Sequence, residues 1–221
     1  MKVQKAEEEL NMGKKKKEAL IQFNKENILS AAGKLFETKG IAATTMDEIA
    51  KEADCSKSTM YVYFKSKEDI LKHIILEQMT HLKELILECM EREKEFTGCF
   101  IEICNKLAQY EEEHPVYYGL LLGEIKVTPE DIKEHTISGQ IYEVGEEVNV
   151  LIEKLLRDGI EHGEVRSDIR IIETVCYLWS GISEIIRFAK AKQDYLNMRL
   201  GLGRKEYMEY ACSLFIRSIE P

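Results

Sequence analysis

The sequence predicts an all-α protein with a small N-terminal module of three helices, joined by a long helix to a larger C-terminal helical domain. Apolar residues repeat every three or four positions from about residue 24 onward. No alternating segment bounded by hairpin turns occurs. A length of 221 residues with 44% hydrophobic and 32% charged side chains fits a folded chain of two domains. We divide it into an extension (1–22), a module (23–70) and a domain (71–221).

The net charge of −9 is unevenly distributed along the chain. Residues 1–70 hold 13 Lys and Arg against 12 Asp and Glu, a net charge of +1, whereas the remaining 151 residues hold 18 against 28, a net charge of −10. An acidic surface repels phosphates, while a near-neutral module with clustered lysines can bind them. Only the N-terminal part is therefore a credible nucleic-acid surface.

The sequence lacks the patterns that are typical of membrane proteins, metalloproteins and several classes of enzyme. No apolar run reaches the ~18 residues of a membrane span, and the charged start lacks the apolar core of a signal peptide, so we expect a cytoplasmic protein without membrane contact. The six cysteines and five histidines have no metal-site spacing, so we expect no metal and no cofactor. Because nucleophile-elbow, phosphate-loop and Rossmann motifs are absent, an enzyme is not expected.

Residues 1–22 are polar and include the run Lys14–Lys17, and we expect no regular structure there. Two interpretations stay open. The run is a basic arm that contacts phosphates or the minor groove, or it is a solvated tail whose charge Glu7–Glu9 partly neutralises.

The first helix is expected to begin at Asn24, as its N-cap, and to end at Gly40. Its apolar stripe is Ile28, Ala32, Leu35 and Phe36. The second helix opens with a capping box, in which the Thr45 side chain accepts from the Glu48 amide and the Glu48 side chain accepts from the Thr45 amide.

A tight turn and a third helix follow. Asp54 tolerates the left-handed conformation that such a turn needs, and Ser56 caps the helix over about 57–64. Met60 and Phe64 are spaced to anchor that helix in the core. The side chains that then point outward are Lys57, Ser58, Thr59, Tyr61 and Tyr63.

The fourth helix opens near Ser66 and keeps an apolar stripe for about 25 residues, which at ~1.5 Å per residue is long enough to connect the module to the next domain. The later helices are predicted over 96–111, 115–126, 129–162, 168–192 and 204–219, between breaks marked by Pro, Gly and Ser-Asp. Residues 169–189 are apolar nearly all round, so we expect a homodimer through the helices 168–192 and 204–219.

Two short helices joined by a tight turn over 45–64 have the geometry of a helix-turn-helix. Three motifs in order make the match specific: Ile28-x-x-Ala-Ala-x-x-Leu-Phe36, Thr45-Met-Asp-Glu-Ile-Ala50 and Ser56-Lys-Ser-Thr-Met-Tyr-Val-Tyr-Phe64-Lys-Ser-Lys67-Glu. Over about residues 24–75 the chain resembles the TetR family of one-component regulators. It departs from that family at Asp54 and Ser58, where Gly is frequent.

The resemblance implies a DNA-binding function for individual residues. Thr45 would contact phosphate, and Lys57, Ser58 and Thr59 would approach bases or phosphates. Tyr61 and Tyr63 would touch the DNA backbone, and Lys67 would hold a phosphate at the start of the fourth helix. For each residue a purely structural role is the alternative.

The resemblance also implies a small-molecule effector in the C-terminal domain. The aromatic candidates for the wall of its pocket are Tyr110, Tyr117, Tyr118, Tyr142 and Trp179. For each of them an ordinary core or interface position is the alternative. Glu111–Glu113 are expected on a solvated face, with a carboxylate beside the pocket that receives a cationic ligand as the alternative. We predict a transcriptional repressor that leaves a palindromic, double-stranded DNA operator when the effector binds. The alternatives are an activator and a DNA-coating protein, the latter needing a more widely basic surface.

Overall fold

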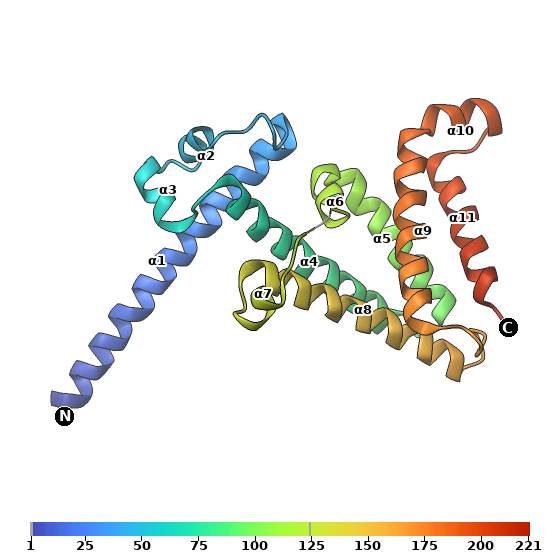
Figure 1. The fold of residues 1–221 in the computed structure, drawn as a ribbon, viewed down its shortest axis with the longest axis horizontal. Coiled ribbons are helices and arrows are strands. Elements are labelled where there is room, and N and C mark those ends of the chain that lie inside the picture. The colour runs from blue at the N-terminus through green and yellow to red at the C-terminus, as the bar shows by residue number, and fades with distance from the viewer. Residues whose placement is uncertain (1, 124) are drawn as a thin grey trace. The chain divides into compact units, whose positions relative to one another are not determined.

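The computed structural model of the protein describes the backbone of residues 2–123 and 125–221, and the side chains of residues 13–123 and 125–221. Within these residues the chain forms eleven α-helices and no strand, so the all-α prediction is confirmed (Figure 1). The chain divides into two compact units, residues 1–74 and residues 75–221. None of the described helices is both long enough and apolar enough to cross a membrane.

The first unit packs three helices and the start of a fourth around one small core. Its elements are α1 (Lys2–Lys39), α2 (Met46–Glu52), α3 (Lys57–Tyr63) and the first turns of α4 (Lys67–Arg92). Each contributes fully buried apolar side chains, among them Ile28, Phe36, Ile49, Met60, Phe64 and Ile70. The apolar periodicity of the sequence therefore identified this core correctly at Ile28, Phe36, Met60 and Phe64.

The expected start of the first helix at Asn24 is wrong, because α1 continues back to Lys2. Asn24 lies inside the helix, and its side-chain amide donates a hydrogen bond of 2.9 Å to the Tyr63 hydroxyl instead of capping. The described stretch of residues 13–22 contains mainly Lys, Glu, Ala, Leu and Ile, which favour helix, and Lys14 pairs with Glu18 one turn later at 4.0 Å. The expectation of irregular structure before residue 23 is thus corrected, with Met1 outside the described residues.

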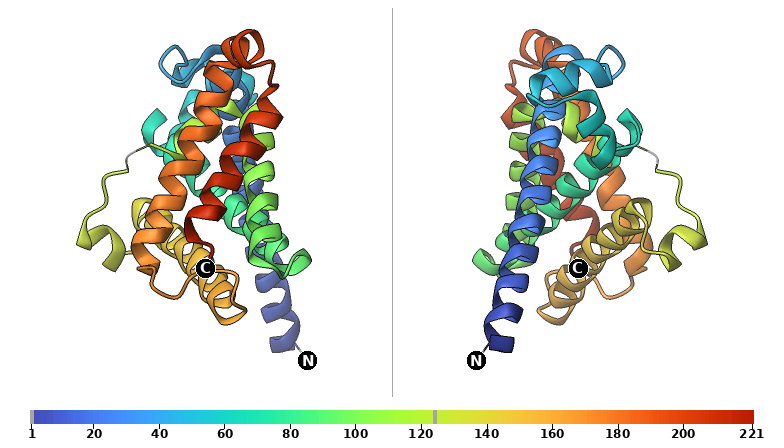
Figure 2. Two further views of the ribbon diagram at one scale, coloured as in Figure 1. Left: turned by 90° about the vertical axis from the view of Figure 1, so that its right-hand side faces the viewer. Right: turned by 90° about the vertical axis from the view of Figure 1, so that its left-hand side faces the viewer.

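The second unit is built from the rest of α4 and seven further helices. These are α5 (Phe96–Glu113), α6 (Pro115–Leu121), α7 (Pro129–Lys133), α8 (Ile137–Glu161), α9 (Ile171–Ala191), α10 (Gln193–Leu200) and α11 (Arg204–Ile219). Buried side chains from α4, α5, α8, α9 and α11 form one apolar cluster. In Figure 2, α9 (orange) and α11 (red) lie side by side.

The helix predicted over 129–162 is interrupted, so that prediction is wrong in the middle. His135 has a left-handed φ of 48°, and Thr136 starts α8 by accepting a hydrogen bond from the Gly139 amide at 3.3 Å. A Cβ on Gly139 would lie 2.2 Å from the Asp131 carbonyl oxygen, so only glycine allows α7 to fold back onto the start of α8. The break depends on this contact, which periodicity does not reveal.

Two other boundaries differ from the prediction. Helix α6 ends at Leu121 instead of residue 126. Helix α10, which was not predicted, occupies 193–200 and ends at Gly201, whose left-handed φ of 66° is typical of a helix C-terminus. Residues 193–200 lack a continuous apolar stripe, which explains why the pattern missed a helix there.

Glu111 is also placed differently from the prediction of a solvated face, because it is buried. Its carboxylate accepts from Arg204 Nη2 at 2.7 Å and from Lys190 Nζ at 2.8 Å, and Arg204 also pairs with Glu112. The pairs join the end of α5 to α9 and to the first residue of α11. A buried carboxylate needs such partners, since an unpaired one would be strongly destabilising.

Candidate DNA interface and ligand cavity

The loop before α2 ends in the predicted capping box. Thr45 Oγ1 accepts from the Glu48 amide at 3.3 Å, and Glu48 Oε2 accepts from the Thr45 amide at 3.0 Å. Hydrogen bonds from Lys39 and then from Thr45 lower the pKa of Glu48 from 4.5 to about 2. The Thr45 side chain is exposed, so it can both hold the start of α2 and face a partner.

The turn between α2 and α3 is the one predicted. Asp54 adopts a left-handed φ of 48°, and Ser56 Oγ accepts from the Thr59 amide at 3.0 Å. The Asn27 side chain on α1 donates to the Ala53 carbonyl at 2.7 Å and ties the turn to the longer helix. Residues of the turn thus set the angle between α2 and α3, and the hydrogen bond from Asn27 on α1 fixes the turn in place.

Helix α3 presents a short polar and aromatic face to solvent. Met60 is fully buried, whereas Lys57, Ser58 and Tyr61 are exposed and Thr59 is partly exposed. The Ser58 and Thr59 hydroxyls both lie within hydrogen-bond distance of Ser56 Oγ, at 2.8 and 2.7 Å. These contacts keep the first turn of α3 ordered.

Three further features of α3 were not read from the sequence. Lys57 Nζ pairs with Asp47 Oδ1 at 2.6 Å, and this carboxylate raises the pKa of the lysine. Tyr63 is half-buried because its hydroxyl accepts from Asn24. Val62 is 78% exposed, an unusual position for an apolar side chain, and it adjoins Tyr61 on the outward side. In the sequence, the exposure of Val62 was indicated only by its position between Tyr61 and Tyr63, both expected to point outward.

Lys67 lies at the start of α4, as predicted, but its ammonium faces the protein. The Nζ atom donates to the carbonyl oxygens of Ile41 at 2.8 Å and Thr44 at 2.9 Å, with the Ala42 carbonyl at 3.5 Å. An ammonium group has three donors, and all three have carbonyl neighbours here. Lys67 therefore holds the loop that leads to Thr45, and its predicted contact with phosphate would compete with these bonds.

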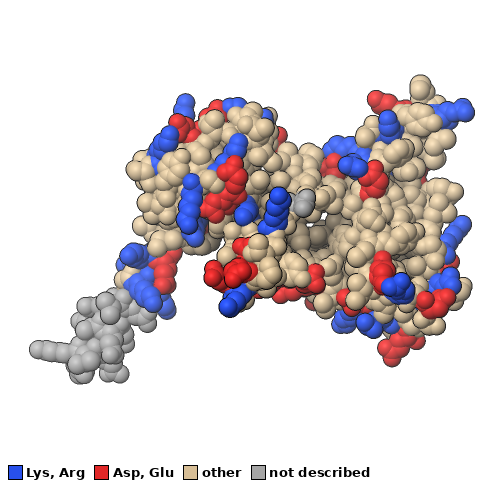
Figure 3. Space-filling model, in the orientation of Figure 1, with Lys and Arg blue, Asp and Glu red and all other residues tan. Residues whose placement is uncertain are grey.

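Charge on the module is mixed. On the face drawn in Figure 3, lysines and acidic side chains alternate over the first unit. Several of its exposed lysines are paired, with Lys34 bound to Glu52 and Lys39 bound to Glu48. Affinity for phosphate from this face would come from a few directed contacts rather than from a large positive patch.

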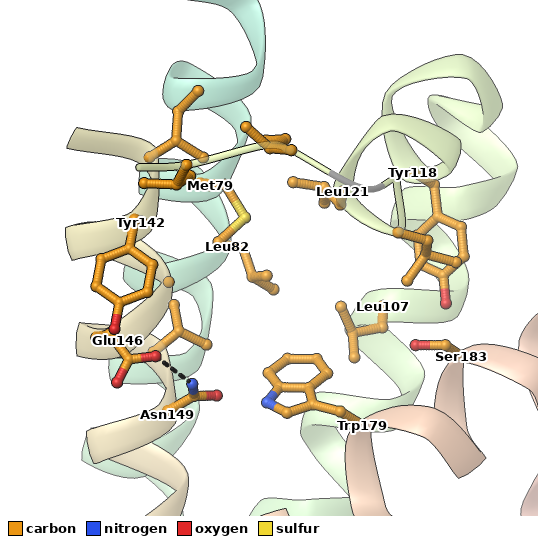
Figure 4. A pocket seen from close by; sticks show the side chains of 16 residues that line it. Met79, Leu82, Leu107, Tyr118, Leu121, Tyr142, Glu146, Asn149, Trp179 and Ser183 are labelled. Carbon is orange, nitrogen blue, oxygen red and sulfur yellow. Dashed lines mark hydrogen bonds between the residues drawn. The ribbon is translucent and has the colours of Figure 1, made fainter. Parts of the chain in front are cut away.

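A cavity of about 350 Å³ lies inside the second unit, between α4, α5, α6, α8, α9 and the segment after α6 (Figure 4). Its lining is mostly apolar, as expected for a small-molecule site. The lining residues are Met79, Leu82, Leu107, Tyr118, Leu121, Leu122, Ile125, Val127, Ile141, Tyr142, Gly145, Glu146, Val148, Asn149, Trp179 and Ser183.

The polar groups of the cavity lie in two places. Tyr142, Glu146 and Asn149 follow one another at helical spacing on α8, and Asn149 Nδ2 donates to Glu146 Oε1 at 3.1 Å. Tyr118 from α6 shares a hydrogen bond with Ser183 from α9, and burial raises the pKa of Tyr118 to about 12. Tyr118 is therefore a neutral hydrogen-bonding group, and Glu146 is the single charged residue among the described ones that line the cavity.

Comparison with known proteins agrees with the helix-turn-helix geometry. The profile of the family described as bacterial regulatory proteins, tetR family, matches residues 28–74. The chain is 28% identical over 144 residues to the uncharacterised HTH-type transcriptional regulator YhgD of Bacillus subtilis (strain 168), covering 64% of this chain and 72% of that one. The helix-turn-helix module at residues 28–74 is therefore of the tetR-family type, and the chain resembles HTH-type transcriptional regulators over a longer stretch.

Other comparisons extend over more of the chain. It is 27% identical over 157 residues to the fatty acid metabolism regulator protein of Bacillus subtilis (strain 168), covering 68% of this chain and 76% of that one. A protein of unknown function from Rhodococcus sp. RHA1 has a TM-score of 0.74 at 15% identity, covering 90% and 96% of the two chains. FadR from Bacillus subtilis, in complex with stearoyl-CoA, has a TM-score of 0.68 at 19% identity, covering 88% and 99%. These structures show the shared fold.

Three of the five aromatic residues predicted for the pocket wall line the cavity: Tyr118, Tyr142 and Trp179. The other two do not. Tyr110 is buried in the core and donates its hydroxyl to Gln78, and Tyr117 stacks on His114 with ring centres 5.7 Å apart. Neighbouring positions on one helix point about 100° apart, which is why Tyr117 and Tyr118 have different surroundings.

The polar members of the cavity were missed by sequence reasoning. Glu146 and Asn149 look like ordinary solvent-facing residues of an amphipathic helix, and Ser183 lies in an apolar stretch. The available signal was the glycine at position 145, one turn from apolar Ile141, in the middle of a long helix. Glycine there leaves space, since an added Cβ would reach only Met79, at 3.5 Å.

Helices α9 and α11 leave an apolar surface uncovered in the single chain. Their inward side chains are buried, but Ile172 and Tyr177 on α9 and Tyr210 and Leu214 on α11 are between 46% and 65% exposed. The two helices approach closely, because Gly181 meets the Phe215 ring without an intervening side chain. Exposed aromatic and aliphatic residues on paired helices are typical of a protein interface.

Proposed function

We propose that this chain is a TetR-family repressor that binds a palindromic operator as a homodimer and leaves it when a small molecule occupies the cavity of the second unit. One observation carries the release step: α4 is a single helix that serves both units. Its Ile70 and Ile74 are buried in the first unit, and its Met79 and Leu82 line the cavity of the second. A ligand that moves the second pair changes the position of a helix that the recognition module needs.

We infer that α3 enters the major groove, with α2 and the neighbouring loops on the phosphates. The residues proposed to contact DNA are Thr45, Lys57, Ser58, Thr59, Tyr61, Tyr63 and Lys67. Exposure of Lys57, Ser58 and Tyr61 around the buried anchor Met60 supports the assignment. Tyr63 and Lys67 already form hydrogen bonds within the protein, so contacts of these two residues with DNA would have to compete with those bonds.

The proposed dimer is formed by α9 and α11 against the same helices of a second copy. The uncovered residues Ile172, Tyr177, Tyr210 and Leu214 support this seam. Two-fold symmetry pairs each helix with its copy and places two recognition helices on one duplex, which is why a palindromic site is expected.

The proposed effector is a small molecule with a large apolar part, since most of the cavity wall is apolar. A solved relative of the same fold, FadR from Bacillus subtilis, was obtained with stearoyl-CoA, which supports an apolar ligand for this chain too. Differential binding of ~1–3 kcal/mol between the two states is enough for a useful switch.

Footprinting on DNA that flanks the protein's own gene tests the proposal. We expect protection of one palindrome and its loss when the effector is added. Lys57→Ala should reduce the salt slope of binding by ~1 per contact, with an unchanged helical spectrum. Lys205→Ala, which removes an exposed lysine from α11, is the matched control. Equal binding to unrelated DNA would indicate a coating protein, and protection that appears only with ligand would indicate an activator.

A further inference from the structure

The cavity carries one uncompensated charge, the carboxylate of Glu146. Among the described residues, its hydrogen-bond partner is the neutral amide of Asn149, and no Lys, Arg or His side chain pairs with it. The basic side chains that reach this part of α8 contact other acids: Lys83 Nζ pairs with Glu147 at 2.8 Å, and His135 Nδ1 lies 3.0 Å from Glu143. A ligand in the cavity therefore meets a negative charge that no basic side chain among the described residues neutralises.

Aromatic faces adjoin this carboxylate. Figure 4 shows Tyr142 next to Glu146 along α8, and Trp179 extending from α9 toward the same end of the cavity, with its indole nitrogen on the side of Asn149. Trp and Tyr rings attract cations through their negative faces, and aromatic groups beside a carboxylate are a common way to hold an ammonium group. The described residues that line the cavity include no Lys, Arg or His that could pair with an anionic group.

The charged residues around the cavity opening add to the preference for a cationic ligand. Tyr142 and Glu146 are exposed, so this end of the cavity meets solvent. Glu143 and Glu147 lie on the same stretch of α8 and border, together with Glu146 and Lys83, an open apolar depression beside the cavity. Three carboxylates against one lysine attract a cation to the opening and repel an anion.

We propose that the effector is a lipophilic cation, an apolar molecule with a protonated amine or quaternary ammonium group that binds at Glu146 between Tyr142 and Trp179. The apolar part fills the space toward Met79, Leu107 and Leu121. This inference rests on the proposed function of the cavity as the effector site, and it separates this chain from a regulator that receives the anionic head group of an acyl-CoA.

Trp179 is the only tryptophan of the chain, so intrinsic fluorescence reports directly on the cavity. The full-length protein is titrated, below micelle-forming concentrations, with dodecyltrimethylammonium and with dodecanoate, two probes of equal chain length and opposite charge. We expect the ammonium probe to bind more tightly. Loss of the charge in Glu146→Gln should weaken its binding on the order of tenfold and abolish the preference between the probes.

Glu161→Gln is the matched control, because it removes an exposed carboxylate of the same helix that lines neither the cavity nor the depression beside it. Circular dichroism at the same probe concentrations verifies that the helices stay folded. Equal or tighter binding of dodecanoate to the wild type, or equal losses in the two variants, would overturn the proposal.

A parallel measurement of operator release distinguishes the two levels of inference. If the ammonium probe binds through Glu146 but leaves the protein on its operator, the ligand class stands and the release mechanism fails. If dodecanoate alone releases the operator, the release mechanism stands and the ligand class is wrong.

Discussion

Replacing Lys67 by Met tests whether this side chain holds the recognition module together. Methionine keeps most of the length of the side chain and removes the ammonium group. In the wild type that group donates to the Ile41 and Thr44 carbonyls at 2.8 and 2.9 Å, while the Ala42 contact of 3.5 Å is too long to count as a full bond. Two charge-assisted hydrogen bonds are therefore lost.

The expected loss follows from the two acceptors. A hydrogen bond with a charged partner contributes about 1.5–3 kcal/mol, and a buried acceptor left without a donor costs about 1–3 kcal/mol. Thr44 is 1% exposed, so water cannot easily replace the lysine at its carbonyl, whereas Ile41 is partly exposed and its carbonyl can be rehydrated. We expect Lys67→Met to lower the free energy of unfolding by about 2–4 kcal/mol.

Urea unfolding followed by circular dichroism measures this change, and operator binding at several salt concentrations measures the other proposed role. Lys65→Met, at an exposed lysine two positions earlier, is the control and should leave the stability within about 0.5 kcal/mol of the wild type. A salt slope reduced by ~1 with unchanged stability would refute the structural role and favour a phosphate contact.

Two further predictions concern acid stability and helix packing. The pKa of Glu48 is lowered to about 2 by Lys39 and then by Thr45, so its contribution is present above pH 4.5 and lost as the pH falls toward 2. Glu48→Gln should flatten the acid limb of a stability-versus-pH curve, and an unchanged limb would contradict a stabilising role of these two contacts. Gly181→Ala gains about 1 kcal/mol in helix propensity, but its Cβ would lie 1.9 Å from the Phe215 ring, and overpacking costs about 1–3 kcal/mol, so thermal unfolding should show net destabilisation. Gly145→Ala, with only Met79 at 3.5 Å, should instead stabilise; equal effects of the two would refute the packing argument.

Much of the DNA-facing module could be read from short stretches of sequence. The capping box at Thr45, the left-handed turn at Asp54 and the anchor Met60 each depend on residues within four positions of one another. Local hydrogen bonds and helical periodicity decide such features, so the same residues produce them wherever the segment occurs. The angle and exposure of α3 follow largely from these choices.

The length of α1 shows the limit of boundary signals. Asn24 is a good N-cap by residue type, but a cap forms only where the preceding residues leave the helix. Here the preceding residues favour helix, and Tyr63, 39 positions away in sequence, takes the Asn24 amide. A local preference was overridden by a favourable continuation and by a tertiary partner.

The sequence by itself determined the helical class and the helix-turn-helix, and it nominated five aromatic residues for the pocket wall without deciding which of them line the cavity. Only the tertiary structure decided the direction of the Lys67 ammonium, the burial of Glu111 against Arg204, and the convergence of Glu146 with Trp179. The physical reason is the distance along the chain over which the interactions act. Capping and periodicity act over one or two turns, whereas a cavity and a buried ion pair require side chains from helices far apart in the chain to meet, and that meeting depends on packing around glycines such as Gly139 and Gly181.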